Sequence, residues 1–205
     1  TNVPDEVDDA LKRPGRMGDL VLEVPDFDRA GAEDVLAIFA RHAQLPWQLN
    51  DEIRTNVDEA EIREKVLRPA LARVFPAVVL RYWTDTQRQV DVTAGEMLAG
   101  AHYREAINGA KKRAARRYLR ELGVPALTLD DVIDSLLDVS LSLADQMKAD
   151  RGMLVRQLQV KVPVARVERV AREELEEHRY LVLSSCYSSR AHPALRPSRS
   201  RVLNH

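Results

Sequence analysis

The spacing of apolar residues indicates that most of the chain is helical. Apolar positions recur every three to four residues from about residue 28 to residue 43, and Asp28 is a suitable N-cap for this helix. The same spacing returns near Asp58 and predicts a second helix. We expect Pro69 to stop or kink the second helix, because proline lacks the amide that a helix interior needs.

Two longer helices are predicted in the middle of the chain. One extends from about Gly100 to Leu122 and ends at Gly123, a residue type common at helix C-termini. The other opens at Thr128, which forms a capping-box pattern with Asp131. The expected apolar stripe of the first is Tyr103, Ile107, Ala110, Ala114 and Tyr118. Its second half is crowded with the cations Lys111, Lys112, Arg113, Arg116, Arg117 and Arg120.

Alternating apolar and polar residues predict a smaller strand content. Residues 78–83 and 88–92 alternate on either side of the polar stretch 84–87, which is typical of a β-hairpin. A short strand is expected at 20–24, closed by a Pro-Asp pair. The expected fold class is therefore mainly α with a β-hairpin.

The pattern changes again after residue 150. Residues 158–164 alternate as in a strand, which Pro163 would restrict to a sheet edge. Residues 166–180 are charged and predict a helix. From Ser184 onward the chain is rich in serine, proline and arginine and has no acidic residue, so we expect a disordered tail at 183–205.

Composition narrows the class of protein. Charged residues make up 31% of the 205 and nearly cancel, at a net −1, which argues against a surface built as a whole for nucleic acid or anionic membrane. A single cysteine, Cys186, fits a reducing, cytoplasmic setting. The apolar runs are too short to span a bilayer. Because the first residue is Thr1 rather than methionine, we expect the chain to be a fragment.

The first sixteen residues are the most informative. They read Thr-Asn-Val-Pro-Asp-Glu-Val-Asp-Asp-Ala-Leu-Lys-Arg-Pro-Gly-Arg. This stretch resembles the second region of homology of AAA ATPases, which runs Thr-Asn-x-Pro, then Asp-x-Ala-Leu, then Arg-x-Gly-Arg. The resemblance implies that residues 1–27 are the end of a P-loop α/β core and that a helical lid follows.

The resemblance also implies roles for individual residues. Asn2 matches the sensor-1 asparagine, which orients the attacking water near the γ-phosphate. Arg13 and Arg16 match the two arginine fingers that complete the nucleotide site of a neighbouring protomer. Gly100 and Ala101 match the Ser-Gly-Ala segment of the lid that packs against base and ribose, although Ala99 stands where the serine is usual. Taken alone, each has a plainer interpretation as a turn, surface or helix-start residue.

The order of elements after residue 28 narrows the resemblance to a subgroup. A helical lid containing a hairpin is similar to the proteasome-associated AAA ATPases of actinobacteria, the ARC/Mpa group. On this basis we expect a lid at 28–148 and a C-terminal extension at 149–182. The resemblance implies that the full-length protein is a ring-forming ATPase, and we expect the ring to be a hexamer of identical chains. It would unfold or remodel protein substrates, with a proteasome-like protease as a further partner.

The sequence lacks the motif that binds the phosphates. No Gly-x-x-x-x-Gly-Lys-Ser/Thr loop occurs in it, and no acidic strand end for magnesium. ATP with Mg2+, the cofactors that the resemblance implies, would be held mainly by residues upstream of Thr1. We therefore expect the isolated chain to be inactive.

Two other functions remain open from the residues alone. The chain can be a non-enzymatic oligomerisation or docking module derived from an AAA lid. The basic run from Lys111 to Arg120 can be a solvated helix face, can pair with the acidic residues that follow it, or can contact nucleic acid. The last is disfavoured, because the run lacks the interleaved aromatic residues of single-strand binders. The five histidines show no ligand spacing, so no metal site is expected.

Overall fold

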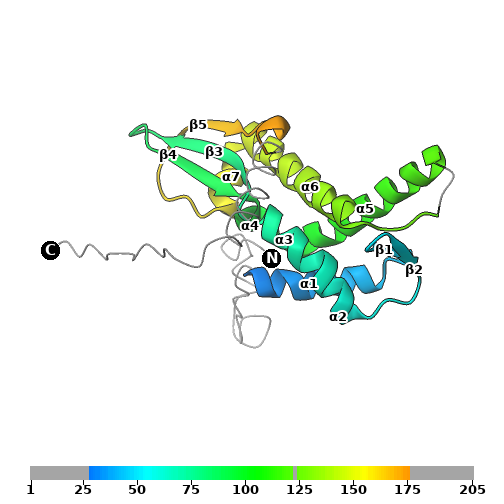
Figure 1. The fold of residues 1–205 in the computed structure, drawn as a ribbon. Helices are drawn as coiled ribbons and strands as arrows, with labels where there is room; N and C mark the ends of the chain where they lie inside the picture. The colour runs from blue at the N-terminus through cyan, green and yellow to red at the C-terminus, as the bar shows by residue number, and fades with distance from the viewer. Residues whose placement is uncertain (1–27, 122–123, 176–205) are drawn as a thin grey trace, which may run out of the picture. The chain divides into compact units, whose positions relative to one another are not determined.

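The computed structural model describes residues 28–121 and 124–175 (Figure 1). Its elements are α1 (Arg29–Arg41), β1 (Trp47–Leu49), β2 (Glu52–Arg54), α2 (Glu59–Ile62), the π-helix η2 (Arg63–Leu67), α3 (Arg68–Val74), β3 (Val78–Thr84), β4 (Gln89–Thr93), α4 (Ala94–Met97), α5 (Gly100–Glu121), α6 (Leu129–Ala149), α7 (Arg151–Gln157) and β5 (Val164–Arg169). Of the described residues, those up to Val170 belong to one compact unit and those from Ala171 to a second. The second is described only over residues 171–175, of which 172–175 are helical.

Helix α6 is the central element of the first unit. Figure 1 shows α5 running beside it, and it also packs against α3, α7 and the strands β3 and β5. A helix enclosed on several sides must be apolar around most of its circumference, and α6 is. Its buried residues include Val132, Ile133, Leu136, Leu137, Leu141, Ala144 and Met147.

The predicted capping box opens α6. The Asp131 amide donates to Thr128 Oγ1 at 3.1 Å, and the Thr128 amide donates to Asp131 Oδ2 at 3.0 Å. Asp28 likewise caps α1, accepting from the Gly31 amide at 2.7 Å. Both helix starts confirm the sequence-based prediction.

Pro69 does not stop the second helix, which continues through it to Val74. The five residues before Arg68 form a π-helix, in which the Arg68 amide donates to the carbonyl of Arg63, five residues back. This wider turn directly precedes the proline, which then lies in the first turn of α3, where a missing amide costs little. The prediction of a stop was therefore wrong, and the proline coincides with a change of helix type.

The predicted hairpin is present as β3 and β4, and it belongs to a three-stranded antiparallel sheet in the order β4-β3-β5. Strand β5 corrects two predictions. The strand expected at 158–164 begins only at Val164, after the proline, and residues 166–169, expected to be helical, continue it. Val167 pairs with Tyr82 and Arg166 with Trp83, whose ring centroid lies 5.0 Å from the guanidinium. The free edge of β3 thus decides the conformation of a segment whose charge pattern favours a helix.

A second, two-stranded hairpin formed by β1 and β2 was not predicted. Its turn residues Asn50 and Asp51 both have positive φ, as a tight two-residue hairpin loop requires. The Gln48 amide donates to the carbonyl of Leu127 at 2.8 Å, and the Leu127 amide to the carbonyl of Pro46 at 2.8 Å. These bonds join the chain after α1 to the chain before α6.

The apolar stripe of α5 is correct except at its last position. Tyr103, Ile107, Ala110 and Ala114 are buried, whereas the side chain of Tyr118 is 41% exposed. Helix α6 begins at Leu129 and its first turn lies opposite Arg117, so the end of α5 projects past it (Figure 1). Helical spacing identifies a face, but the length of the neighbouring helix decides where burial ends.

The described residues are thus mainly helical with small antiparallel sheets, which confirms the coarse fold class. The strand expected at 20–24, the C-cap Gly123 and the tail at 183–205 lie outside them. Within the described ranges, none of the helices is long and apolar enough to cross a membrane.

Candidate functional site

Of the residues to which the resemblance assigns a role, the structure describes Gly100 and Ala101. Asn2, Arg13 and Arg16 lie outside the described residues. Gly100 is the first residue of α5, as the sequence predicts; Gly100 is half-buried and Ala101 is exposed.

His102 shapes this helix start. The Ala99 amide donates to His102 Nδ1 at 2.9 Å, so the imidazole caps the preceding turn. Burial lowers the pKa of His102 below its usual value, although the charge of Glu105 opposes the shift. The ring is therefore neutral at pH 7, which an accepting nitrogen requires. The first amides of a helix have no partner within it, and the half-buried Gly100 has no side chain to obstruct an acceptor that approaches them.

A groove of about 640 Å³ extends from this helix start between α5 and α6. We call it the α5–α6 groove. Its lining on α5 is Ala101, His102, Arg104, Glu105, Asn108, Gly109, Lys112, Arg113 and Arg116, and on α6 it is Ser135, Asp138, Val139 and Ser142. From Ala101 to Arg116 the helix rises about 22 Å at 1.5 Å per residue, so the groove is long and narrow.

Gly109 sets how closely the two helices approach at the floor of the groove. A Cβ atom at this position would lie 2.1 Å from Ser135 Oγ, far inside van der Waals contact. Ser135 itself is buried. The absence of a side chain at Gly109 therefore allows α5 and α6 to pack at this separation.

Two of the α5 arginines pair with acidic residues of α6, as one of the alternatives from the sequence predicted. Arg117 binds both carboxylate oxygens of Asp131 at 2.8 Å and donates to the carbonyl of Ala126 at 2.7 Å. Arg113 pairs with Asp134 at 3.5 Å and with Asp138. These pairs lie on the row of α5 that faces α6.

The neighbouring row of α5 points outward and forms the rim of the groove as far as Arg116. It consists of Arg104, Asn108, Lys112, Arg116 and Arg120, each four residues from the next and all exposed, and we call it the outer ridge. Residues four apart lie above one another on a helix, about 6 Å apart along its axis. In the sequence these cations form a run from Lys111, which leaves out Arg104 and Asn108. A count in steps of four residues along the helix brings both into the row.

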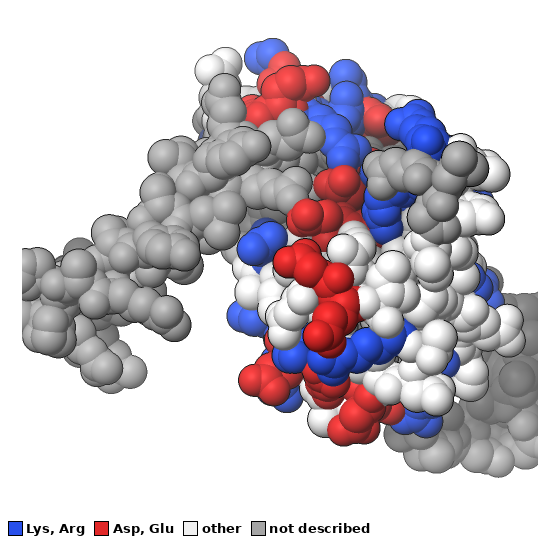
Figure 2. Space-filling model, turned by 45° about the vertical axis from the view of Figure 1, so that its right-hand side comes forward, with Lys and Arg blue, Asp and Glu red and all other residues white. Residues whose placement is uncertain are grey.

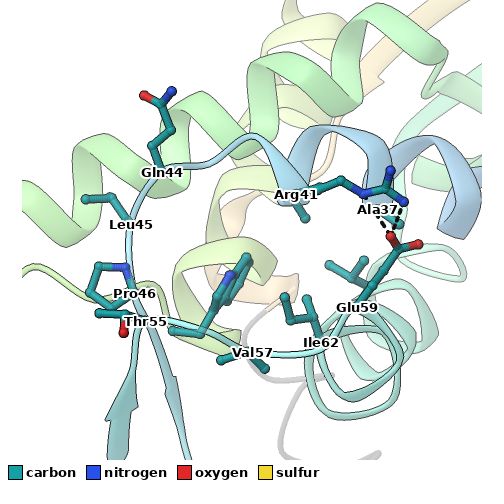
Figure 3. A pocket seen from close by; sticks show the side chains of 12 residues that line it. Ala37, Arg41, Gln44, Leu45, Pro46, Thr55, Val57, Glu59 and Ile62 are labelled. Atoms are coloured by element: carbon teal, nitrogen blue, oxygen red, sulfur yellow. Dashed lines mark hydrogen bonds and ion pairs between the residues drawn. The ribbon is translucent and has the colours of Figure 1, made fainter.

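A second cavity, of about 400 Å³, lies beside the loop after α1 (Figure 3). It is mostly apolar, with Leu45, Val57 and Ile62 in its wall. The ion pair of Arg41 and Glu59 stands at its edge, with Arg41 Nε 2.9 Å from Glu59 Oε2. Hydrogen bonds from Arg41 and Arg63 lower the pKa of Glu59, so this carboxylate stays charged. None of the residues predicted from the sequence as functional lines this cavity.

On the face drawn in Figure 2, basic and acidic side chains are interleaved. They alternate in a band down this face, beside an uncharged area. Within 28–121 and 124–175, no group of three histidine, cysteine, aspartate or glutamate side chains could hold a metal ion.

No protein-family model matches this sequence. Its function must therefore be argued from its own residues.

Proposed function

We propose that this chain is the C-terminal part of a ring-forming AAA ATPase that couples ATP hydrolysis to protein unfolding or remodelling. The observation that carries the proposal is the order of residues in the first sixteen positions. Asn2, Arg13 and Arg16 occur there at the offsets at which sensor 1 and the two arginine fingers occur in that family. Association with a proteasome-like protease and assembly as a hexamer belong to the same proposal.

The proposed role of the two arginines follows from the charge that develops during phosphoryl transfer. Negative charge spreads over the oxygens of the transferred group, and a guanidinium offers fixed donors and a permanent positive charge. A finger supplied by a neighbouring protomer makes hydrolysis depend on assembly. The loss of such a finger lowers turnover by about 10³- to 10⁵-fold.

The described unit would act as the lid in this proposal. The half-buried start of α5 fits a nucleotide, since Gly100 carries no side chain and lets a base or ribose approach the backbone closely. The described residues offer no cluster of acidic ligands for Mg2+, and we assign them no role in holding it. These residues would bind the nucleoside, and the conformation of the unit would depend on whether it is bound.

The test uses the protein encoded by the full reading frame that contains this chain. Arg13→Ala and Arg16→Ala should each lower ATP turnover by at least about a thousandfold and leave ATP binding within a few-fold. Arg88→Ala is the matched control, because Arg88 is an exposed arginine of the hairpin turn, and its turnover should be normal. Normal turnover in both finger variants would refute the proposal.

The alternative is a non-enzymatic oligomerisation or docking module derived from an AAA lid. It is favoured by the lack of a phosphate-binding loop in the sequence. The codons that precede Thr1 distinguish the two: a Gly-x-x-x-x-Gly-Lys-Ser/Thr motif followed by an acidic strand end supports the ATPase. A reading frame that lacks both motifs supports the docking module instead.

A further inference from the structure

The length of the α5–α6 groove suits an extended peptide segment better than a small molecule. Its lining extends along α5 from Ala101 to Arg116, a rise of about 22 Å. An extended peptide advances about 3.3 Å per residue, so about seven residues would fill that length.

The charges of the groove favour an acidic occupant. Four cationic side chains line it against two acidic ones, Glu105 and Asp138. Asp138 is already paired with Arg113, which faces α6. Arg104, Lys112 and Arg116 lie on the outer ridge, with their charges exposed along one wall.

The spacing of these cations favours a peptide over a nucleic acid. Lys112 and Arg116 lie about 6 Å apart along α5, and Arg104 lies two such steps before Lys112. In an extended peptide every second side chain points to the same face, about 6.6 Å apart, so alternating carboxylates match this wall. Apart from the imidazole of His102 the lining contains no aromatic ring, and single-stranded nucleic acids rely on such rings for stacking.

The rest of the lining suits a peptide backbone. Asn108 and Ser142 are exposed in the groove and carry groups that both donate and accept hydrogen bonds. We propose that the α5–α6 groove binds an extended acidic segment of another protein, whose alternate carboxylates face Arg104, Lys112 and Arg116. The proposal does not depend on ATP hydrolysis, and the 205-residue chain itself can be tested.

The experiment measures fluorescence anisotropy of labelled octapeptides with the 205-residue chain at low and at high salt. The probe (Glu-Ser)4 places all four carboxylates on one face. The probe (Glu-Glu-Ser-Ser)2 has the same composition and charge but divides its carboxylates between two faces. The alternating probe should bind several-fold more tightly, and its affinity should fall as salt screens the charges.

A pair of variants with equal charge change locates the site. Replacing Arg104, Lys112 and Arg116 together by serine should weaken binding of (Glu-Ser)4 by about tenfold or more. The control replaces Arg88, Lys148 and Lys161 by serine; these are exposed cations outside the groove, and the change should be less than about twofold. Circular dichroism checks the fold. If the groove triple variant is unfolded, Lys112→Ser alone should still weaken binding measurably.

Three results would overturn the proposal. They are equal weakening in the two triple variants, no binding of (Glu-Ser)4 to the wild-type chain at low salt, and tighter binding of an eight-nucleotide thymidylate than of the peptide. The first would indicate a response to net charge alone, and the last would assign the groove to nucleic acid.

Discussion

Replacing Arg117 by methionine tests what holds the far end of α5 against α6. The Asp131 carboxylate is only 6% exposed, and Arg117 binds both of its oxygens. Methionine keeps the length and apolar stem of the side chain but removes the charge. Asp131 would then be left buried with its hydrogen bonds to Thr128 as its remaining polar contacts in this cluster.

The expected cost follows from the burial of the two partners. Removal of one member of a fully buried ion pair costs about 3–5 kcal/mol. The arginine is 33% exposed, so water already weakens the pair, and the two bonds to Thr128 still stabilise the carboxylate. We therefore expect Arg117→Met to lower the free energy of unfolding by about 2–3 kcal/mol, which moves a urea midpoint down by ~1 M.

Arg113→Met is the matched control, one turn earlier on the same row of α5. Its partners Asp134 and Asp138 are 27% and 44% exposed, and pairs of this kind contribute about 0–1 kcal/mol. Urea unfolding followed by far-UV circular dichroism compares the two variants with the wild type. Equal midpoints for Arg117→Met and Arg113→Met would refute the reasoning, because burial of the carboxylate would then make no difference.

Two further predictions concern the same pair of helices. Gly109→Leu should lower the free energy of unfolding by about 2 kcal/mol or more, because a side chain at this position collides with Ser135. Leucine has a higher helix propensity than glycine, so propensity cannot explain a loss of stability. A thermal melt measures the change, and an unchanged melting temperature would contradict the close approach of the two helices. His102 is half-buried and its pKa is lowered, so the folded chain binds this proton less readily than the unfolded chain. Stability should therefore fall as the pH drops below about 6.5 towards the folded pKa. His102→Asn, which keeps an accepting oxygen, should reduce this pH dependence in urea titrations at pH 7.5 and 5.5; an unaltered dependence would assign it to other groups.

The sequence by itself determined four helical segments, which correspond to α1, to α2 through α3, to α5 and to α6, together with the hairpin of β3 and β4. The short helices α4 and α7 were not predicted. Periods of three to four residues, the N-cap Asp28 and the box of Thr128 with Asp131 are local patterns, and hydrogen bonds between residues three apart form the two caps. The start of α5 at Gly100, where the resemblance implies a nucleotide, was likewise predicted from the local sequence.

Only the tertiary structure decided which faces and edges have partners. Residues 166–169 form a strand because they pair with the edge of β3, which is distant in the sequence. Tyr118 is exposed because α6 begins opposite Arg117 and does not extend far enough to cover it. The sequence offered the pairing of α5 with α6 as one alternative, but only the structure shows that Gly109 lies at the floor of the α5–α6 groove and lets the two helices approach closely there. The period of apolar residues identifies which face of a helix is apolar. Whether that face is buried depends on a second element that packs against it, and the residues of that element lie elsewhere in the chain.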